Sequence, residues 1–196
     1  MARLPAVLEV LSRLDGRSVW SMETVARALR EAGYLPPSQS GWGAEHVRPP
    51  HAAVMLIALM GTDAPSASAE VAARYWPLRS LAIPHHLPDP LSAILRLPFG
   101  PALAGLLEAF PTIVHETRGA RWELTISRPF PVAELRIREG TGIRLVAQWC
   151  STPDAGAVII DGAHRGQCVN KITQTTVTEE TFSSLSALTN SLEAGE

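Results

Sequence analysis

The segment from residue 122 to residue 149 reads WELTISRPFPVAELRIREGTGIRLVAQW. Apolar and polar side chains alternate in it: a glutamate separates Trp122 from Leu124, and an arginine separates Leu135 from Ile137. A period of two places successive side chains on opposite faces of a strand, so the segment predicts strands with one apolar and one solvated face. Its short connections make these strands antiparallel neighbours.

The apolar face of such a sheet needs a cover, and the end of the chain can supply one. We expect strands at residues 122–126, 134–138, 143–149 and 157–160. Thr178 is the expected N-cap of a C-terminal helix, because two glutamates follow it. Apolar residues then recur at helical spacing, namely Phe182, Leu185, Leu188 and Leu192. This helix is expected to lie on the sheet.

Before residue 111, apolar residues recur every three or four positions, which is the period of an α-helix. Helices are expected at residues 5–14, from an N-cap at Ser21 to Gly33, at residues 49–60, at residues 69–81 with an interruption at Pro77, and at residues 91–110, where Pro111 ends the helix. The sequence therefore predicts an α+β protein: an N-terminal helical bundle, which could take a helix-turn-helix-like form, and then a small antiparallel sheet with a C-terminal helix. Two domains are expected, residues 1–110 and residues 111–196.

Length and composition limit the class of protein. Of the 196 residues, 46% are apolar and 18% are charged, which suffices for a packed core. The net charge of −2 excludes a surface that attracts nucleic acid everywhere, although it allows a local basic patch. The N-terminus lacks the features of a signal peptide, and the longest apolar run, Ala52 to Met60, is far shorter than the ~20 residues that span a bilayer. We therefore expect a cytoplasmic protein that does not enter the membrane.

Three short helices within residues 1–60 resemble the framework on which DNA-binding proteins display a recognition helix. This part carries six arginines and five acidic residues, whereas the rest of the chain carries eleven basic and fourteen acidic residues. The basic excess predicts a module that contacts double-stranded DNA. Its candidate contact residues are Arg27, Arg30, Gln39 and Arg48. Residues 111–196 would then hold two copies together as a homodimer, because paired modules add their contacts to one duplex.

Two features count against DNA binding. The segment from Tyr34 to Pro50 is much longer than the turn of about three or four residues in a helix-turn-helix, and the third helix is too apolar to lie in a groove. The alternative is a protein-binding surface with aromatic anchors, for which Tyr34, Trp42 and Trp76 are the candidates.

No motif in the sequence predicts an enzyme, since both the phosphate-binding loop GxxxxGK[ST] and the nucleophile elbow GxSxG are absent. His164 and Cys168 are four residues apart and belong to residue types that bind zinc. Further ligands would have to come from Asp161, Cys150 or His115. Without a CxxC pair or an HExxH helix, a simple turn is the better interpretation, and we expect no metal or cofactor.

Three segments carry a resemblance: ALREAGYLPP at residues 28–37, RPPHAAVMLIALMG at residues 48–61 and FGPALAGLLEAF at residues 99–110. With the Gly-Trp-Gly loop between the first two, they make the chain similar to uncharacterised proteins of phages and prophages from GC-rich bacteria. The resemblance implies a phage context but no particular chemistry. In that context, a DNA-binding protein would be a transcriptional regulator. A protein-binding factor would be an inhibitor of a host defence complex or a structural component of the virion.

Overall fold

Five antiparallel strands form a sheet in the computed structural model of this chain. The structure describes residues 3–37, 46–82, 87, 89–116, 120–139, 142–151 and 173–190. The strands are β1 (Arg79–Ala82), β2 (Arg121–Arg128), β3 (Val132–Glu139), β4 (Gly142–Cys150) and β5 (Thr173–Thr178). Their order in the sheet is β1-β4-β3-β2-β5. The alternating segment thus forms three neighbouring antiparallel strands, as predicted.

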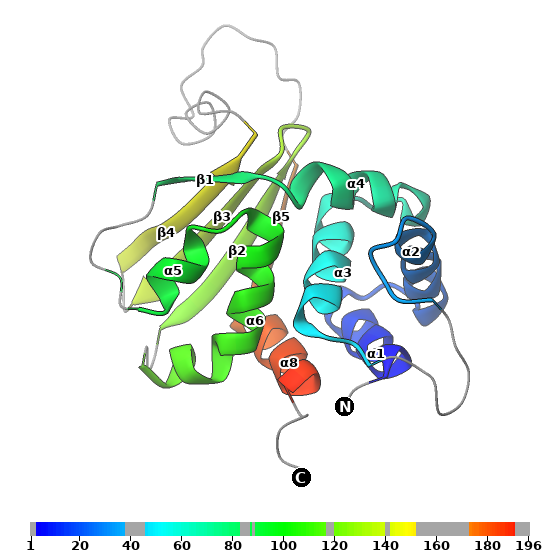
Figure 1. The fold of residues 1–196 in the computed structure, drawn as a ribbon, viewed down its shortest axis with the longest axis horizontal. Coiled ribbons are helices and arrows are strands. Elements are labelled where there is room, and N and C mark those ends of the chain that lie inside the picture. Colours follow the sequence, from blue (N-terminus) through cyan, green and yellow to red (C-terminus); the bar gives the residue numbers. More distant parts are fainter. Residues whose placement is uncertain are drawn as a thin grey trace, which may run out of the picture.

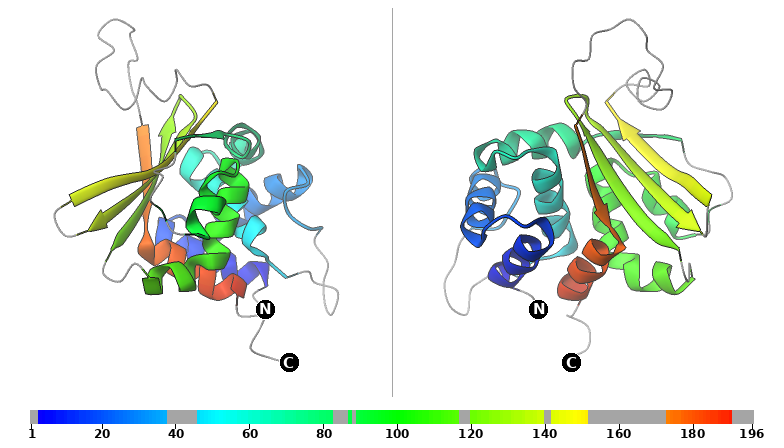
Figure 2. Two further views of the ribbon diagram at one scale, coloured as in Figure 1. Left: turned by 60° about the vertical axis from the view of Figure 1, so that its left-hand side comes forward. Right: turned by 180° about the vertical axis from the view of Figure 1, so that it is seen from behind.

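The two faces of the sheet carry apolar and polar side chains as the alternation predicts, but the polar face is not solvated throughout, because Glu134 and Gln148 are buried on it and hydrogen-bonded to each other. Trp122 and Ile137 lie opposite each other on neighbouring strands, and both are buried on the face that packs against the helices. On the other face, the hydroxyl groups of Thr125 and Thr176 form a hydrogen bond of 2.9 Å between β2 and β5. Figure 2 shows the helices gathered on one side of the sheet.

The helices are α1 (Leu4–Asp15), α2 (Val19–Glu31), α3 (Pro49–Gly61), α4 (Ser68–Tyr75), α5 (Leu91–Leu95), α6 (Phe99–Glu116) and α8 (Glu179–Asn190), with one 3-10 turn, η2 (Pro65–Ala67). In Figure 1, α5 and α6 lie in front of the sheet, and α1 to α4 lie beside it. The prediction of an α+β protein with N-terminal helices, an antiparallel sheet and a C-terminal helix is confirmed.

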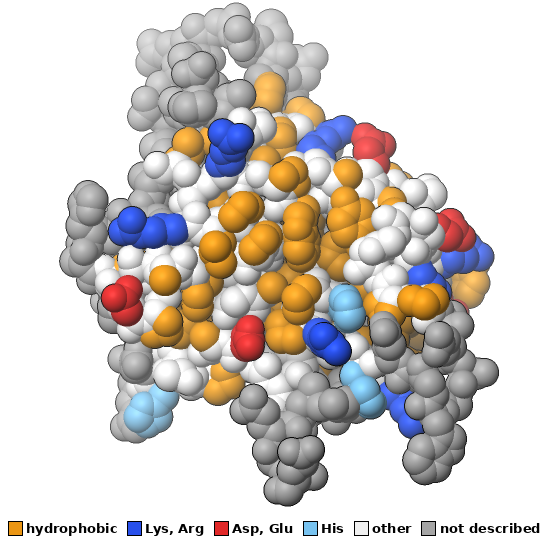
Figure 3. Space-filling model, viewed as in Figure 1, with side chains coloured by type: hydrophobic (Ala, Val, Ile, Leu, Met, Phe, Trp, Pro, Cys, Tyr) orange, Lys and Arg blue, Asp and Glu red, His pale blue; other side chains and the backbone are white. Residues whose placement is uncertain are grey.

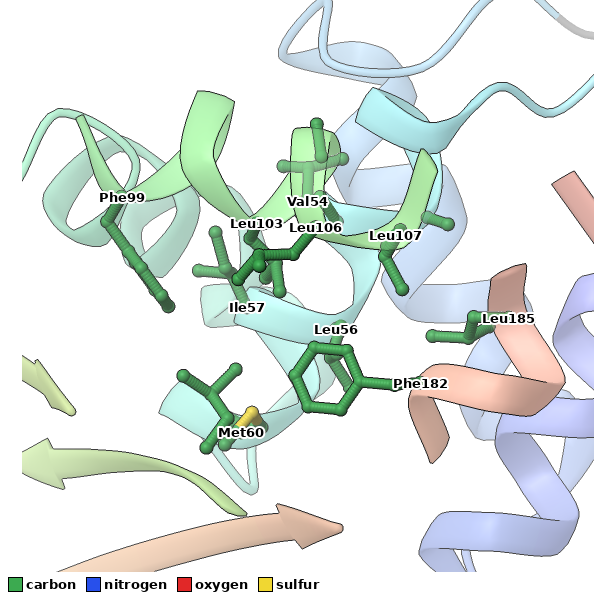
Figure 4. Close-up of a cluster of buried hydrophobic side chains, with 14 of the residues drawn as sticks. Val54, Leu56, Ile57, Met60, Phe99, Leu103, Leu106, Leu107, Phe182 and Leu185 are labelled. Carbon is green, nitrogen blue, oxygen red and sulfur yellow. The ribbon is translucent and has the colours of Figure 1, made fainter. Parts of the chain in front are cut away.

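Helix α3 lies at the centre of the helical part. All its residues from Ala52 to Gly61 are buried, as expected for a helix that is apolar on every side. It packs against α6 and α8, and Figure 4 shows Ile57, Leu103 and Phe182 of these three helices in one cluster. A helix enclosed in this way has no row of side chains that could enter a DNA groove.

Helix α6 continues past Pro111 to Glu116, so the prediction that this proline ends the helix is wrong. Proline has no backbone N–H, and the carbonyl group of Leu107, four residues earlier, therefore loses its helical donor. The side chain of Asn190 supplies a replacement, because its Nδ2 lies 3.2 Å from the carbonyl oxygen of Leu107 and 2.9 Å from that of Glu108. A tertiary hydrogen bond from the end of α8 thus takes the place of the helical one that the proline removes.

Other helix boundaries also differ from the prediction. The N-cap of α2 is Ser18, whose hydroxyl accepts a hydrogen bond of 3.3 Å from the N–H of Ser21, so the helix begins earlier than expected. The helix predicted for residues 69–81 ends at Tyr75, and the residues after the next proline form β1. The helix predicted for residues 91–110 is divided into α5 and α6, with a proline before α6.

The sequence does not predict β5, because its threonines and glutamine give no apolar period of two. Its backbone pairs along one edge with β2, and this tertiary pairing defines the strand. The strand predicted at residues 157–160 and the apolar residue Leu192 lie outside the described residues.

Helices and sheet share one hydrophobic core, whose buried members extend from Val7 to Leu185. The division into two domains at residue 110 means that each part could fold without the other, and it stays a prediction. None of the described helices is long and apolar enough to cross a membrane.

Candidate partner-binding site

An apolar surface lies on the outer side of the helices, around Tyr34 and Trp76. The two ring centroids are 6.5 Å apart, and both side chains are half-buried. Trp76 lies over the first turn of α6, where a β-carbon on Gly100 would come within 2.1 Å of the indole ring. In a similar way Ile94 of α5 lies against Gly105 of α6, at 3.2 Å from a β-carbon built there. The glycines of α6 let these side chains approach closely, and we call Tyr34, Trp76 and Ile94 the apolar face.

Figure 3 shows hydrophobic side chains gathered over α5, α6 and the neighbouring ends of α3 and α4, with charged side chains around them. The backbone beside Trp76 is fixed, because its carbonyl oxygen accepts a hydrogen bond of 3.0 Å from the N–H of Gly100. Large apolar patches rimmed by polar residues are typical of interaction sites, and aromatic side chains are typical anchors in them.

A hollow of about 540 Å³ opens beside Tyr34, where the C-terminal end of α2 meets the N-terminal end of α3. Gly33 ends α2 in the left-handed conformation, with φ at 79°, and turns the chain so that Tyr34 forms a wall. The volume is in the range of sites for small ligands or side chains. The lining residues are Arg30, Glu31, Gly33, Tyr34, Leu35, Pro36, Pro37 and His51.

Two polar side chains of the hollow are oriented by the backbone. The Nε of Arg30 donates a hydrogen bond of 3.2 Å to the carbonyl oxygen of Pro36. The Nδ1 of His51 accepts one of 3.2 Å from the N–H of Arg48. The hollow is therefore lined by a guanidinium, an imidazole and the carboxylate of Glu31.

The three described arginines that were predicted to contact DNA have different surroundings. Arg27 is exposed on α2, with Glu23 four residues before it and Glu31 four residues after it on the same side of the helix. Arg30 is half-buried in the wall of the hollow, and Arg48 is exposed at the N-cap of α3. The two glutamates lower the positive potential around Arg27. Binding to a phosphate backbone would require a strongly positive potential there.

Of the aromatic residues predicted as anchors, Tyr34 and Trp76 lie together at the apolar face, although far apart in the sequence. Trp42 and the predicted DNA contact Gln39 lie outside the described residues.

Sequence reasoning missed His51 and Trp20. The side chain of Trp20 is 74% exposed, an unusual position for a tryptophan. The signal was present: with the N-cap at Ser18, Trp20 falls on the side of α2 opposite the buried Met22. For His51, the sequence shows only the third residue of a helix that begins with two prolines.

Five residues are candidate metal ligands by their type, and three of them, Asp161, His164 and Cys168, lie outside the described residues. Cys150 is buried in β4, and His115 is exposed on α6. Within the described ranges, no group of three or more histidine, cysteine, aspartate or glutamate side chains could hold a metal ion.

Comparison with known proteins gives no relative from which a role could be transferred: no protein-family model, no curated protein and no solved structure matches the chain. Its function has to be argued from the apolar face and the hollow.

Proposed function

We propose that the chain is a protein-binding factor whose partner docks on the apolar face and the adjoining hollow. The observation that carries this proposal is the surface pair of Tyr34 and Trp76, with ring centroids 6.5 Å apart and a glycine beneath the indole ring. Preformed aromatic anchors lose little conformational entropy when a partner covers them, and they often dominate the binding energy. In the phage context that the resemblance implies, the partner is a protein of the host, such as a defence complex, or of the virion.

A DNA-binding transcriptional regulator is the second proposal, and the exposed side chains of Arg27 and Arg48 support it. Three observations favour the protein-binding factor over it. The central helix α3 is enclosed, the guanidinium of Arg30 is partly engaged with its own chain, and two glutamates accompany Arg27. A homodimer formed through residues 111–196 is compatible with either function.

The test compares the full-length wild type with the variants Trp76→Ala, Tyr34→Ala and Trp20→Ala. Each variant is first shown to fold by its unfolding transition in urea. Partner capture from phage-infected host cells is then quantified at low and at high salt. We expect Trp76→Ala and Tyr34→Ala to lose the captured protein at both salt concentrations. Trp20→Ala removes an exposed tryptophan outside the apolar face, so this variant should still capture the partner protein.

Duplex DNA is the second ligand in this experiment. Salt-sensitive binding of DNA that disappears when Arg27 and Arg30 are replaced together by alanine would favour the regulator. Sedimentation of the same proteins measures their oligomeric state and tests a third outcome, in which the occupant is another copy of the chain. If the homodimer forms through residues 111–196, Trp76→Ala remains a dimer. Loss of the dimer in this variant would instead identify a second copy of the chain as the occupant of the apolar face.

A further inference from the structure

We propose that the protein partner presents a proline-rich segment in the polyproline II conformation to the apolar face. One proline of this segment packs on the indole ring of Trp76, and another packs on the phenol ring of Tyr34. Backbone carbonyl groups of the segment accept hydrogen bonds from the polar groups of the two rings. This inference rests on the proposed function and names the kind of partner that the apolar face binds.

The indole ring of Trp76 lies with one face on α6. A β-carbon built on Gly100 would be 2.1 Å from Cδ2 of this ring, and 2.4 and 2.5 Å from the neighbouring Cε3 and Cε2. Such similar distances to an atom and both of its neighbours place the β-carbon above the plane of the ring, so one face of the indole covers Gly100. The side chain is half-buried and therefore presents its other face, which points away from α6.

Tyr34 continues this surface at an angle. Its ring centroid is 6.5 Å from that of Trp76, and the two ring planes are 51° apart, so the rings are tilted and not stacked. A polyproline II helix has three residues per turn and rises about 3.1 Å per residue. Two of every three side chains can therefore touch one surface, and residues two positions apart are separated by about 6 Å along the axis. This spacing is comparable to the distance between the two rings.

Both rings carry a hydrogen-bond donor. Among the described residues, no group accepts from the indole Nε1 of Trp76 or from the hydroxyl of Tyr34, and neither of these atoms is buried. The carbonyl groups of an α-helix are bound within the helix, and a β-strand binds by pairing with the edge of a sheet. Tyr34 and Trp76 follow helices α2 and α4, so they offer no such edge. A polyproline II segment has no internal hydrogen bonds, and its carbonyl groups are available to both donors.

The charges of the adjoining hollow also favour an uncharged segment. Arg30 and Glu31 both line the hollow, so their formal charges cancel, and its walls include the apolar residues Leu35 and Pro36. A volume of about 540 Å³ accommodates a further side chain of the segment beside Tyr34. Because polyproline II is preformed in a proline-rich chain, binding it costs little conformational entropy.

The experiment uses a capped peptide of ten prolines as the probe and a capped glycine–serine peptide of the same length as the uncharged, flexible control. The full-length chain is titrated with each peptide, and the indole N–H signals of Trp76 and Trp20 are followed by NMR. We expect a saturable shift of the Trp76 signal with the proline peptide and binding of the control about tenfold weaker. The signal of Trp20, which is 74% exposed outside the apolar face, should not move.

Two matched variants test the indole donor. Trp76→Phe keeps an apolar ring but loses the N–H, so we expect it to bind the proline peptide about tenfold more weakly than the wild type does. The backbone amide signal of Gly100, whose N–H donates to the carbonyl oxygen of Trp76, reports binding in this variant. Trp20→Phe, the same substitution at the exposed position, should bind the peptide as the wild type does. Urea unfolding first shows that both variants fold.

Equal binding of the two peptides would overturn the proposal, and so would unchanged binding of the proline peptide in Trp76→Phe. A wild-type dimer that dissociates in Trp76→Ala would also overturn it, because a second copy of the chain would then occupy the apolar face. The titration does not use the protein partner. Loss of the partner in Trp76→Ala without any preference for the proline peptide would therefore contradict the proline-rich segment alone, whereas such a preference with partner capture unaffected in Trp76→Ala would contradict the proposed function.

Discussion

Both ends of α3 lie beside an arginine, but the two arginines are used differently. At the C-terminal end, Arg17 donates to the carbonyl oxygens of Leu59 at 2.5 Å and Thr62 at 3.0 Å, and it also pairs with Asp15. At the N-terminal end, Arg30 donates through Nε to one backbone carbonyl group. An arginine whose donors are occupied by its own chain holds the fold together. Among the described residues, Arg30 has a single backbone acceptor and lies in the wall of a hollow.

The difference follows from what each helix end has to satisfy. The last carbonyl groups of a helix have no helical donor, and α3 has no basic residue in its last turn, so Arg17 from the turn between α1 and α2 fills that role. The unsatisfied groups at the other end are N–H groups, and Pro49 and Pro50 have none. The N-terminal end therefore makes little demand on its neighbours, and a guanidinium, which carries only donors, could not serve N–H groups in any case. Among the described residues, the acceptor of Arg30 is the carbonyl oxygen of Pro36.

Arg17→Ala tests the structural end of this comparison and should have the largest effect. It removes charge-assisted hydrogen bonds from the carbonyl groups of Leu59 and Thr62, so we expect the free energy of unfolding to fall by about 2–3 kcal/mol. Urea unfolding followed by circular dichroism measures the change. Arg13→Ala, at an exposed position of α1, is the matched control and should change it by less than about 0.5 kcal/mol. Equal losses in both variants would show that Arg17 does not support α3.

Asn190→Ala tests the carbonyl group of Leu107, which accepts its hydrogen bond from a side chain far away in the sequence. Without the Nδ2 of Asn190, the carbonyl oxygen of Leu107 has no donor, and we expect a loss of about 1–2 kcal/mol in the free energy of unfolding. Pro111→Ala restores an N–H four residues after Leu107. In the Pro111→Ala background, Asn190→Ala should lower the free energy of unfolding by less than it does in the wild type. A double-mutant cycle measures this coupling between Pro111 and Asn190. Additive losses would mean that the two residues act independently.

Tyr75→Phe tests a tie between the helices and the sheet, and its expected effect is smaller. The hydroxyl of Tyr75 donates a hydrogen bond of 2.7 Å to the carbonyl oxygen of Ser127 in β2. Since both groups are buried, we expect a loss of about 1 kcal/mol in the free energy of unfolding near neutral pH.

The same variant should change the response to alkaline pH. Burial raises the pKa of Tyr75 above its ordinary value of 10.0, an effect that Arg74 and Arg128 partly oppose. The folded protein therefore holds this proton more tightly than the unfolded chain does. The resulting contribution to stability is complete below pH 10.0 and disappears as the pH rises through the raised pKa of the folded state. Urea titrations on both sides of pH 10.0 should show a shallower decline in Tyr75→Phe than in the wild type.

The sequence predicts the parts of the fold that depend on local periodicity. Strands β2 to β4 and helix α1 follow from the spacing of apolar residues in the sequence, and helix α3 follows from an unbroken apolar run behind two prolines. Helix α6 continues beyond Pro111 and contacts Asn190 there, and no local pattern contains that contact. Strand β5 has no apolar period and is defined by its neighbour β2.

The candidate site is less predictable than the fold, for a similar reason. Residue type made Tyr34, Trp76 and Arg30 candidates, but their meeting at one surface is a tertiary result. Sequence spacing also treats Arg27 and Arg30 alike. The structure distinguishes them, because one is exposed between glutamates and the other is held by a backbone carbonyl group at the wall of the hollow.

Arg30→Gln should have the smallest effect on stability and is the sharpest test of the comparison between the two ends of α3. The variant loses one half-buried hydrogen bond to Pro36, so we expect the free energy of unfolding to change by about 0.5 kcal/mol or less. Arg17→Gln, the same substitution at the other end, should cost several times more, because two carbonyl groups lose their donors. Both free energies come from urea unfolding under identical conditions. If the two variants lost equal stability, the guanidinium of Arg30 would stabilise the fold as much as that of Arg17 does. It would then not be available to a partner.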